Sequence, residues 1–379
     1  MDEGQIVPSL RAIVAHVPDP RARRGRRHPW TALLLLVIVG LLCGANTQHA
    51  LARWAHTTGW ARLRRLGFVR RGGPSQPTLH RLLRDVNVDQ LEAVLGPWLQ
   101  HVRRRWQQQA RHWLDGIAID GKTLRGARRL GAADAHLVSA FCQRRGLSLG
   151  QVAVPDPTNE LGALSPLLAQ LVLADETVTF DALFTQTTVA KQVVQQGGAY
   201  LMVVKGNQQW LLADITAATA RRPRRPVRRL GRAHSVRLAH GRFEQRTLEA
   251  TAAPPDLGWP HARQVLRLQR RFISKRTGQV LHDEIVYAVT SLSPDQASPA
   301  QLLRLWQAHW RIENQLHWVR DVVFGEDRST TRTAHAHQAL AAFRNLAISL
   351  IHWLRDSHVT AAREYFASHP TTLLRLLAL

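Results

Sequence analysis

The chain has 379 residues, 45% of them hydrophobic, enough to bury a sizeable core and to form two domains or one domain with a large insertion. Its 51 lysines and arginines outnumber 27 aspartates and glutamates, giving a net charge of +24 and a pI near 11.6. Charge of this size repels itself unless a polyanion neutralises it, so we expect a nucleic acid partner and salt-sensitive binding. Arginine supplies nearly all of the positive charge, which favours bidentate phosphate contacts, although a GC-rich genome would also enrich arginine.

Two cysteines, Cys43 and Cys142, lie far apart in apolar segments. This excludes a disulfide framework or a cysteine zinc site and fits a reducing cytoplasm. The most apolar stretch, Ala32 to Ala45, is shorter than the roughly 20 residues that cross a bilayer. It also follows too many arginines to resemble a signal peptide. We therefore predict a buried helix, no membrane partner and a cytoplasmic, nucleoid-associated protein.

The N-terminal part, residues 1–112, is expected to form an all-α domain. Short helices with arginines on their outer faces fit a DNA-binding module, and an all-α dimerisation or packing domain fits equally well. The expected features are a basic loop at Asp19–Pro29, a helix at Gln48–Leu66, a break at Gly72–Pro77, a helix capped by Ser75 or Thr78, and a helix at Leu91–Trp106.

After Trp113, short apolar runs alternate with helical segments, which predicts an α/β sheet. The expected strands are Gly116–Lys122, His136–Cys142, Leu149–Val154, Val178–Ala182 and Tyr200–Asn207, and the expected helices are Asn159–Leu173 and Thr188–Gln196. Two of the apolar runs end in aspartate, at Asp120 and Asp181. Side chains at the carboxyl ends of such strands meet at one edge of the sheet and form sites.

Residues from about 213 to 293 interrupt this alternation. A proline-broken basic run, Arg221–Arg229, is expected to be an exposed loop. His240–Ala250, Val265–Ile273 and Val280–Leu292 alternate like strands, which predicts a β-rich insertion. The arginines of this insertion favour a DNA-facing surface; a solvated loop with a hairpin is the alternative.

A long helix is expected to start at Ser298 or Gln301 and to carry Glu313. Glu313, His317 and Asp321 are four positions apart and share a helix face, which suits a metal or phosphate site. Many surface helices also have such polar pairs. An acidic loop, Gly325–Asp327, follows, and then a helix at Ala334–Arg355.

Asp120, Asp181 and Glu313 come from separate elements and can converge at the sheet edge. Phosphodiester chemistry requires convergence of this kind, because two Mg²⁺ ions about 3.5–4 Å apart activate the attacking hydroxyl and stabilise the leaving oxygen. Taken singly, each aspartate is more often a turn or cap residue, and Asp120-Gly121 is a common turn dipeptide. A zinc or iron site formed by His309, Glu313 and His317 is another alternative, but it leaves both aspartates unexplained.

Several motifs resemble those of DDE-class insertion-sequence transposases of the H-repeat-associated (ISAs) family. They are Ile119–Gly126, Thr158–Leu161, Phe180–Gln186, Val203–Gln208, His309–Trp318 and Phe324–Ser329, with Asp19–Arg21 and Pro74–Thr78 in the helical part. The resemblance covers nearly the whole chain. Their order and spacing together are more specific than any one motif.

The resemblance implies an α/β fold in which a ribonuclease-H-like catalytic core, residues 113–379, is interrupted by the β-rich insertion. It implies that Asp120, Asp181 and Glu313 are catalytic and bind Mg²⁺ or Mn²⁺. DNA-binding or supporting roles are expected for Lys122, Arg125, Lys205, Asn207, Asn314, His317 and Arg320. Trp306 and His309 stand where the wider superfamily often has tyrosine and arginine, and their roles stay open.

The function that the resemblance implies is transposition. The enzyme would cut double-stranded DNA at the ends of its own insertion sequence and join them to target DNA, acting as a homodimer on DNA. The alternative is a catalytically inactive, sequence-specific DNA-binding protein derived from such an element.

Overall fold

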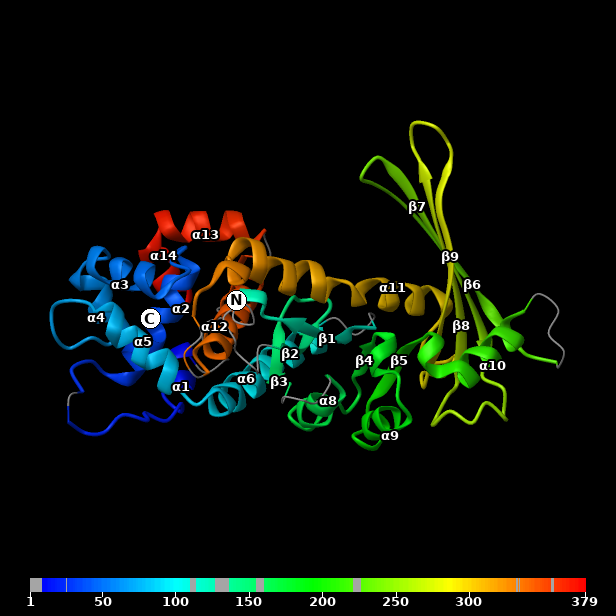
Figure 1. Cartoon of the computed structure of the whole chain (residues 1–379), viewed down its shortest axis with the longest axis horizontal. Coiled ribbons are helices and arrows are strands. Elements are labelled where there is room, and N and C mark those ends of the chain that lie inside the picture. The colour runs from blue at the N-terminus through cyan, green and yellow to red at the C-terminus, as the bar shows by residue number, and fades with distance from the viewer. Residues whose placement is uncertain are drawn as a thin grey trace. The chain divides into compact units, whose positions relative to one another are not determined.

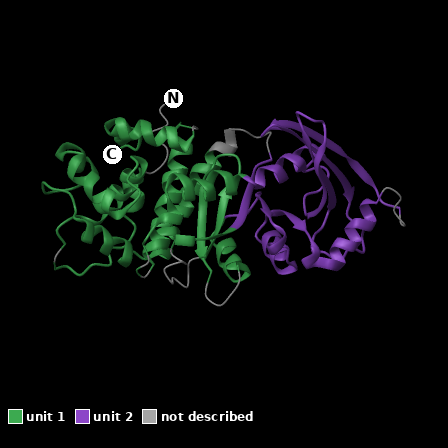
Figure 2. Cartoon of the chain, turned by 45° about the horizontal axis from the view of Figure 1, so that its top comes forward, with its two compact units in different colours: residues 1–110, 121–171, 311–379 green, residues 111–120, 172–310 purple. Residues whose placement is uncertain are grey.

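The computed structural model describes residues 9–24, 26–109, 114–126, 136–154, 160–220, 226–331, 333, 335–355 and 358–379 (Figure 1). The chain divides into two compact units (Figure 2). The first contains residues 1–110, 121–171 and 311–379, and the second contains residues 111–120 and 172–310. The predicted boundary at 112/113, residues 221–225 of the basic run, and Thr158 and Asn159 of the predicted motif lie outside the described residues.

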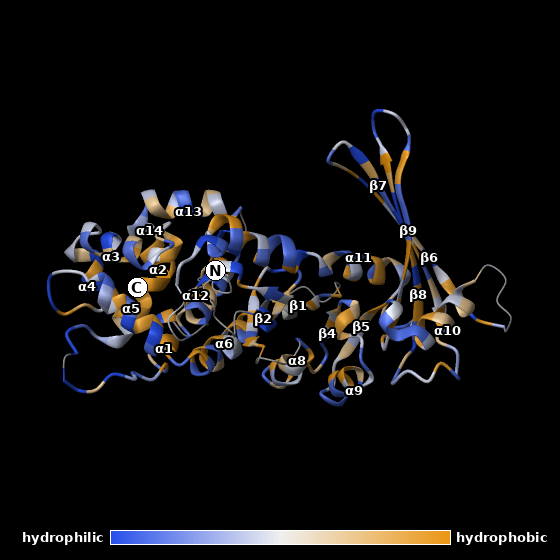
Figure 3. Ribbon diagram, in the orientation of Figure 1, coloured by the Kyte–Doolittle hydropathy of each residue, from blue (hydrophilic) through white to orange (hydrophobic). Residues whose placement is uncertain are grey.

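The first unit is mainly helical. Its helices are α1 (Leu10–Val14), α2 (Trp30–Leu42), α3 (Gln48–Thr57), α4 (Trp60–Leu66), α5 (Gln76–Asp85), α6 (Val88–Gln109), α8 (Glu160–Ala169), α12 (Ala336–Arg355), α13 (Val359–Ser368) and α14 (Pro370–Leu376). All residues of α2 except Thr31 are buried, and Figure 3 shows its hydrophobic colouring. The predicted buried helix is therefore confirmed. No helix among the described residues has both the length and the hydrophobicity that a membrane span requires.

The single helix predicted at Gln48–Leu66 is wrong, because the chain forms α3 and α4 there. The break falls at Gly59, whose φ is +88°. A right-handed helix cannot pass through this backbone conformation, which glycine adopts at little cost. Apolar periodicity continued across the break and concealed it.

Helix α6 packs against strand β3 (Ser148–Ala153) and buries a carboxyl group in this contact. Burial raises the pKa of Glu92 to about 8, although hydrogen bonds with Gln151 act in the opposite direction. The folded protein therefore holds this carboxyl in its neutral form at pH 7.

Glu92→Gln is expected to stabilise the protein at pH 8 and to change its stability little at pH 5. The unfolded carboxyl ionises near 4.5 and the folded one near 8, so the stability of the wild type falls as the pH rises between these values. Glutamine does not titrate and removes this loss, which is on the order of a few kcal/mol. Urea unfolding at both pH values measures the effect; an equal change at pH 5 and pH 8 would contradict a neutral buried Glu92.

The strands form a mixed sheet. They are β1 (Gly116–Thr123), β2 (His136–Cys142), β3, β4 (Thr177–Phe180), β5 (Ala199–Val204), β6 (Arg229–Ala239), β7 (Arg242–Ala252), β8 (Gln264–Ser274) and β9 (Val280–Thr290). Within the described residues, the order of this nine-stranded sheet is β3-β2-β1-β4-β5-β9-β8-β7-β6. Strands β1, β4 and β5 are parallel, and β6 to β9 form an antiparallel series joined to β5 through β9. A mixed α/β fold with an N-terminal helical region is thus confirmed.

The second unit contains η2 (Ala182–Phe184), α9 (Thr187–Gln195), η3 (Gly206–Gln208), α10 (Gln209–Thr219) and α11 (Pro299–His309). Helix α11 contacts β6 and β7, and Trp306 belongs to a core cluster with Leu248, Leu266 and Leu302. Trp306 is 6% exposed. Trp306, for which the sequence predicted no role, is therefore a residue of the hydrophobic core.

Strand β6 was missed, because the basic run was expected to be a loop through Arg229. It is the last strand of the sheet, and most of its residues are exposed or half-buried, so its sequence has little apolar alternation. The turn to β7 contains His240 and Gly241, both with positive φ, which is the geometry of a tight hairpin. The strand expected from His240 therefore begins at Arg242.

Candidate active site

Asp120 and Asp181 stand side by side in the register of two parallel strands. The last pair in the register of β1 and β4 is Ile119 with Phe180, where β4 ends; Asp120 follows Ile119 within β1, and Asp181 is the first residue after β4. Neighbouring strands lie about 4.8 Å apart, so the two acids are held close together by the backbone. Strand β1 runs to Thr123, one residue beyond the predicted strand Gly116–Lys122, and Asp120-Gly121 is extended rather than the turn that the dipeptide alone would suggest.

Asp181 lies in a half-exposed, basic setting. It precedes η2, and its Oδ1 lies 3.7 Å from Nζ of Lys205; both side chains are about half exposed. Asn207 donates from Nδ2 to the carbonyl oxygen of Ala182 at 2.7 Å. Asn207 therefore ties η3 to the residue after Asp181, while Lys205 is exposed.

The helix that leads to Glu313 begins as predicted. Ser298 and Gln301 form a capping box at the start of α11. After Trp310 the hydrogen-bonding pattern changes to π-helix in η4 (Glu313–His317) and again in η5 (Val319–Val323). π-Helical turns are rare and occur frequently at functional sites.

Glu313 and His317 form a hydrogen-bonded pair within η4. His317 Nδ1 lies 3.0 Å from Glu313 Oε2, and His317 is 1% exposed. The hydrogen bond from His317 is the main cause that lowers the pKa of Glu313, while burial lowers the pKa of His317. At neutral pH this favours a neutral imidazole that donates Nδ1–H to an ionised carboxylate.

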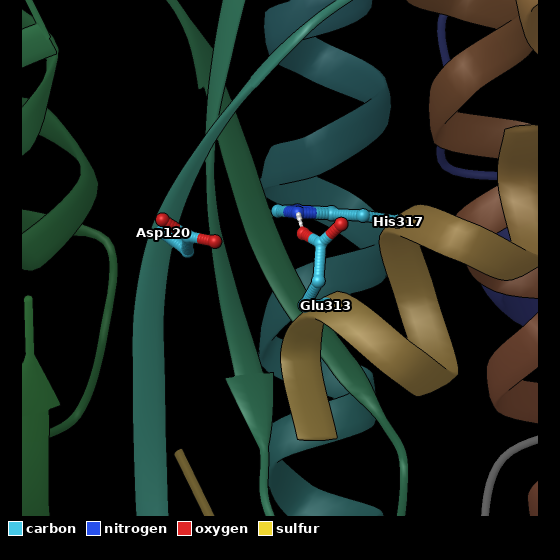
Figure 4. Close-up of side chains that lie close together, drawn as sticks. All are labelled: Asp120, Glu313 and His317. Carbon is cyan, nitrogen blue, oxygen red and sulfur yellow. Dashed lines mark hydrogen bonds and ion pairs between the residues drawn. The ribbon is translucent and has the colours of Figure 1, made fainter. Parts of the chain in front are cut away.

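Figure 4 shows Asp120 together with this pair. Ligand atoms of Asp120, Glu313 and His317 all lie within 4.8 Å of one another, the one such group of potential metal ligands in the described part of the chain. Strand β1 continues directly from Asp120 into Gly121 of the first unit. Carboxylate oxygens suit Mg²⁺, and an imidazole nitrogen is also acceptable to Mn²⁺. His309 is not a member of this group.

Lys122 and Asp321 form a second pair beside Glu313. Lys122 Nζ donates to Asp321 Oδ2 at 2.6 Å, and Lys122 is 8% exposed. The positive charges of Lys122 and Arg125 also contribute to the lowered pKa of Glu313. Lys122 is therefore held in a buried ion pair, whereas Arg125 and Asn314 are exposed.

The predicted acidic loop contains a buried ion cluster. Glu326, in η6 (Glu326–Arg328), accepts from Arg320 Nε at 2.9 Å and from Arg344 Nη1 at 2.9 Å. Arg320 is fully buried, so in this structure it supports the helix from inside and has no surface for phosphate. Sequence reasoning missed Glu326 and Arg344, although an arginine within the apolar face of α12 is a signal for a buried acidic partner.

His309 links two elements of the second unit. Its Nδ1 lies 2.8 Å from Oγ1 of Thr179, and both side chains are buried. Thr179 precedes Asp181 by two residues in β4, so the contact holds this strand against α11. His309, for which the sequence also predicted no role, thus packs in the interior and forms a hydrogen bond with Thr179.

The model of the protein family described as "Transposase DDE domain" matches residues 114–350 of this chain. A second family model, described as "DDE_Tnp_1-associated", matches residues 12–99. Acidic side chains from parallel strands and a helix, in a basic α/β chain, are features of the DDE class. The chain belongs to the family of transposases with a DDE domain.

Its relatives include proteins of H-repeat elements, which confirms the resemblance found in the sequence. "Putative transposase YncI" of Escherichia coli O157:H7 is 29% identical over 368 residues, covering 92% of this chain and 89% of the relative. "H repeat-associated putative transposase YhhI" of Escherichia coli K12 is 27% identical, covering 90% of each chain. A solved structure described as a piggyBac transposase synaptic complex with hairpin DNA aligns with a TM-score of 0.40 and 12% identity, covering 91% of this chain and 72% of that chain.

Proposed function

We propose that the protein is an active DNA transposase whose catalytic residues are Asp120, Asp181 and Glu313. The observation that carries this proposal is the register of the parallel strands β1 and β4, in which Asp120 and Asp181 each directly follow a residue of the last pair, Ile119 and Phe180. The grouping of Asp120 with Glu313 and His317 supports the third acid. In this proposal residues 113–379 form a ribonuclease-H-like core and residues 1–112 assist in DNA binding.

The donor set fits a divalent metal ion. Asp120, Asp181 and Glu313 offer carboxylate oxygens, which are the preferred ligands of Mg²⁺ and are acceptable to Mn²⁺. Metal ions bound in such a site would activate the attacking hydroxyl and stabilise charge on the leaving oxygen. Within the described residues, the group of potential ligands with atoms within 4.8 Å of one another is Asp120, Glu313 and His317; Asp181 is not a member of it.

In this proposal the remaining residues orient the Glu313 carboxylate and bind the phosphates of the DNA. His317 donates Nδ1–H to Glu313 and fixes the direction of its carboxylate. Lys205, beside Asp181, and Arg125, near Glu313, supply positive charge for the phosphates that flank the scissile bond. In this proposal the substrate is double-stranded DNA at the ends of the element, the freed 3′-hydroxyl then attacks target DNA, and two copies of the chain act together.

A nicking assay tests the proposal. The probes are the DNA segments that flank the gene, with Mg²⁺ or Mn²⁺, and the variants are Asp181→Asn and, as a matched control on the exposed face of α10, Asp214→Asn. We expect metal-dependent, site-specific nicking by wild type and Asp214→Asn, and none by Asp181→Asn, with DNA binding in EDTA retained by all three. Salt-sensitive binding without nicking by the wild type would instead support the inactive DNA-binding protein.

A further inference from the structure

A cavity of about 660 Å³ with several polar lining side chains lies within the first unit, apart from the acidic residues. Its walls are the first turns of α3 and α5, the segment from Phe324 to Thr331, and Arg344 of α12. Ligand cavities that hold small molecules have volumes of about 300–1,000 Å³. A single nucleotide fits such a volume, whereas a base pair in a duplex cannot enter it.

One wall carries an amide and imidazole cluster. Gln76 Nε2 donates to Gln48 Oε1 at 3.2 Å, and His80 Nδ1 lies 3.2 Å from the same oxygen. In the described part of the chain, the Gln48 amide nitrogen and the Gln76 amide oxygen have no other partner, so the wall offers a donor and an acceptor side by side. That pairing matches the hydrogen-bonding edge of a nucleobase.

The charges beneath the cavity are unbalanced. Buried Arg320 and Arg344 share one carboxylate, Glu326, and Nε of Arg344 is buried without a hydrogen-bond partner in the described residues. Buried Arg363 stacks on Phe324, a lining residue, at 4.2 Å.

Arg363 has no acidic partner among its hydrogen bonds. It donates to the carbonyl oxygens of Leu41 and Val323 and to Asn46 Oδ1. Glu92 does not compensate for these charges either, because burial raises its pKa to about 8 and it is neutral at pH 7. Three buried guanidinium groups therefore lie near one buried carboxylate, Glu326; the charge of Asp321 also acts on Arg344, but Asp321 is paired with Lys122. Burying positive charge without full compensation is costly.

The mouth of the cavity adds further groups that bind anions. Arg328 is exposed and lines the cavity, and within the described residues no carboxylate forms an ion pair with it. The first turns of α3 and α5, each ten residues long, bring the positive ends of two helix dipoles to the same space. A phosphate group bound at Arg328 and these helix ends would offset part of the excess charge.

We propose that this cavity binds one unpaired nucleotide of a DNA strand, with the base against Gln48, Gln76 and His80 and the phosphate against Arg328 and Arg344. The proposal rests on the proposed function only in taking DNA as the substrate. The cavity of about 660 Å³ admits one base and not a base pair, so the nucleotide must be unpaired when it enters.

Fluorescence anisotropy in EDTA, where no cleavage occurs, tests the proposal. The probes are a short single-stranded oligonucleotide of mixed sequence and the same sequence as a duplex. The double variant Gln48→Ala/Gln76→Ala is expected to lose about tenfold in affinity for the single strand and little for the duplex. Gln90→Ala, an exposed amide of α6, is the matched control and should behave as wild type. Equal losses for both probes, or no loss for the single strand, would overturn the proposal.

Arg328→Gln separates the phosphate contact from the base contact. It is expected to lower single-strand affinity and to reduce the salt dependence by about one phosphate contact, whereas Arg375→Gln, an exposed arginine of α14, should not. Thermal unfolding of each variant identifies any loss that comes from misfolding. An unchanged salt dependence in Arg328→Gln would remove Arg328 from the site.

Site-directed crosslinking gives a measurement that does not depend on affinity. The natural cysteines, Cys43 and Cys142, are buried, and burial raises the pKa of Cys43 to about 12, so an introduced surface thiol would react selectively. His49→Cys, at the cavity, should undergo thiol–disulfide exchange with a single strand carrying an activated disulfide on one base, releasing the leaving thiol. His56→Cys, exposed at the other end of α3, should not; equal reaction at both positions would contradict the site.

The two proposals fail in different ways. Wild-type protein that nicks duplex ends but binds single strands independently of Gln48 and Gln76 would overturn the cavity proposal and leave the transposase function intact. Protein that binds single strands through these residues but does not nick in Mg²⁺ or Mn²⁺ would overturn the catalytic proposal alone. Absence of all DNA binding would overturn both.

Discussion

Replacement of Glu313 by glutamine is expected to lower the rate of strand cleavage by about a thousandfold or more. Glutamine has nearly the same shape, but it removes the negative charge that a divalent ion requires. Loss of a charged metal ligand is worth several kcal/mol in the transition state, and about 1.4 kcal/mol corresponds to a tenfold change in rate. Single-turnover cleavage at saturating Mg²⁺ measures this effect.

The variant His317→Gln distinguishes the contribution of the Glu313 carboxylate from that of the histidine that orients it. His317 contacts Glu313 through Nδ1 and is buried, so its loss should disturb the direction of the carboxylate rather than its charge. Residues that orient metal ligands typically contribute 10–100-fold in metal affinity or activity. We therefore expect a higher Mg²⁺ requirement in His317→Gln, with partial rescue at high Mg²⁺, and no rescue of Glu313→Gln.

Glu364→Gln is the matched control, because Glu364 is an exposed glutamate of α13 in the same unit. It should cleave at the wild-type rate. If Glu313→Gln cleaves within tenfold of wild type at the same thermal stability, Glu313 is not a metal ligand and the catalytic assignment fails.

The parts of the fold that the sequence predicted are those with strong local patterns. The continuous apolar run of α2 and the short strands β2, β4 and β5 are recognisable, because buried elements are rich in apolar and β-branched residues. Strand β6 has exposed positions on both faces and therefore lacks this signal. The break at Gly59 depends on one backbone angle, which periodicity does not detect.

The site was predictable where local geometry determines it. Asp120 and Asp181 each follow one residue of the last pair in the register of β1 and β4, and a four-residue spacing on one helix brings Glu313 and His317 together. The partner of Asp321 was not predictable, because Lys122 is 199 residues away in the chain.

The burial of Glu326 was not predictable either. Its sequence context, Gly-Glu-Asp-Arg, is typical of an exposed turn, and only the position of α12 shows that it is enclosed by two arginines. Tertiary contacts of this kind leave no periodic pattern in the sequence.

The enclosed carboxylate of Glu326 is expected to make a large contribution to the stability of the folded protein. Glu326→Gln is expected to destabilise the protein by about 3–5 kcal/mol, the usual cost of removing one partner from a buried ion pair. Glu326 is 3% exposed, and after the change Arg320 and Arg344 would be buried without a counter-charge. Urea unfolding at pH 7 measures the difference, with Asp85→Asn, from the exposed pair of Arg84 and Asp85, as the control expected to change stability by less than about 1 kcal/mol.

The pH dependence of this effect has a defined sign. Burial opposes ionisation of Glu326, but the charges of Arg320 and Arg344 prevail and hold its pKa below the usual value of 4.5. The stability that the carboxylate contributes is therefore fully present above pH 4.5 and is lost as the pH falls through the folded-state pKa. The difference between wild type and Glu326→Gln should shrink in acid.

A second substitution tests whether unpaired charge causes the loss. Adding Arg344→Met to Glu326→Gln removes one of the two unpaired guanidinium groups and fills its volume with an apolar side chain, so the double variant should be more stable than Glu326→Gln alone. If both substitutions destabilise additively, the cluster contributes through packing rather than through charge, and the excess positive charge beneath the cavity would not require an anion.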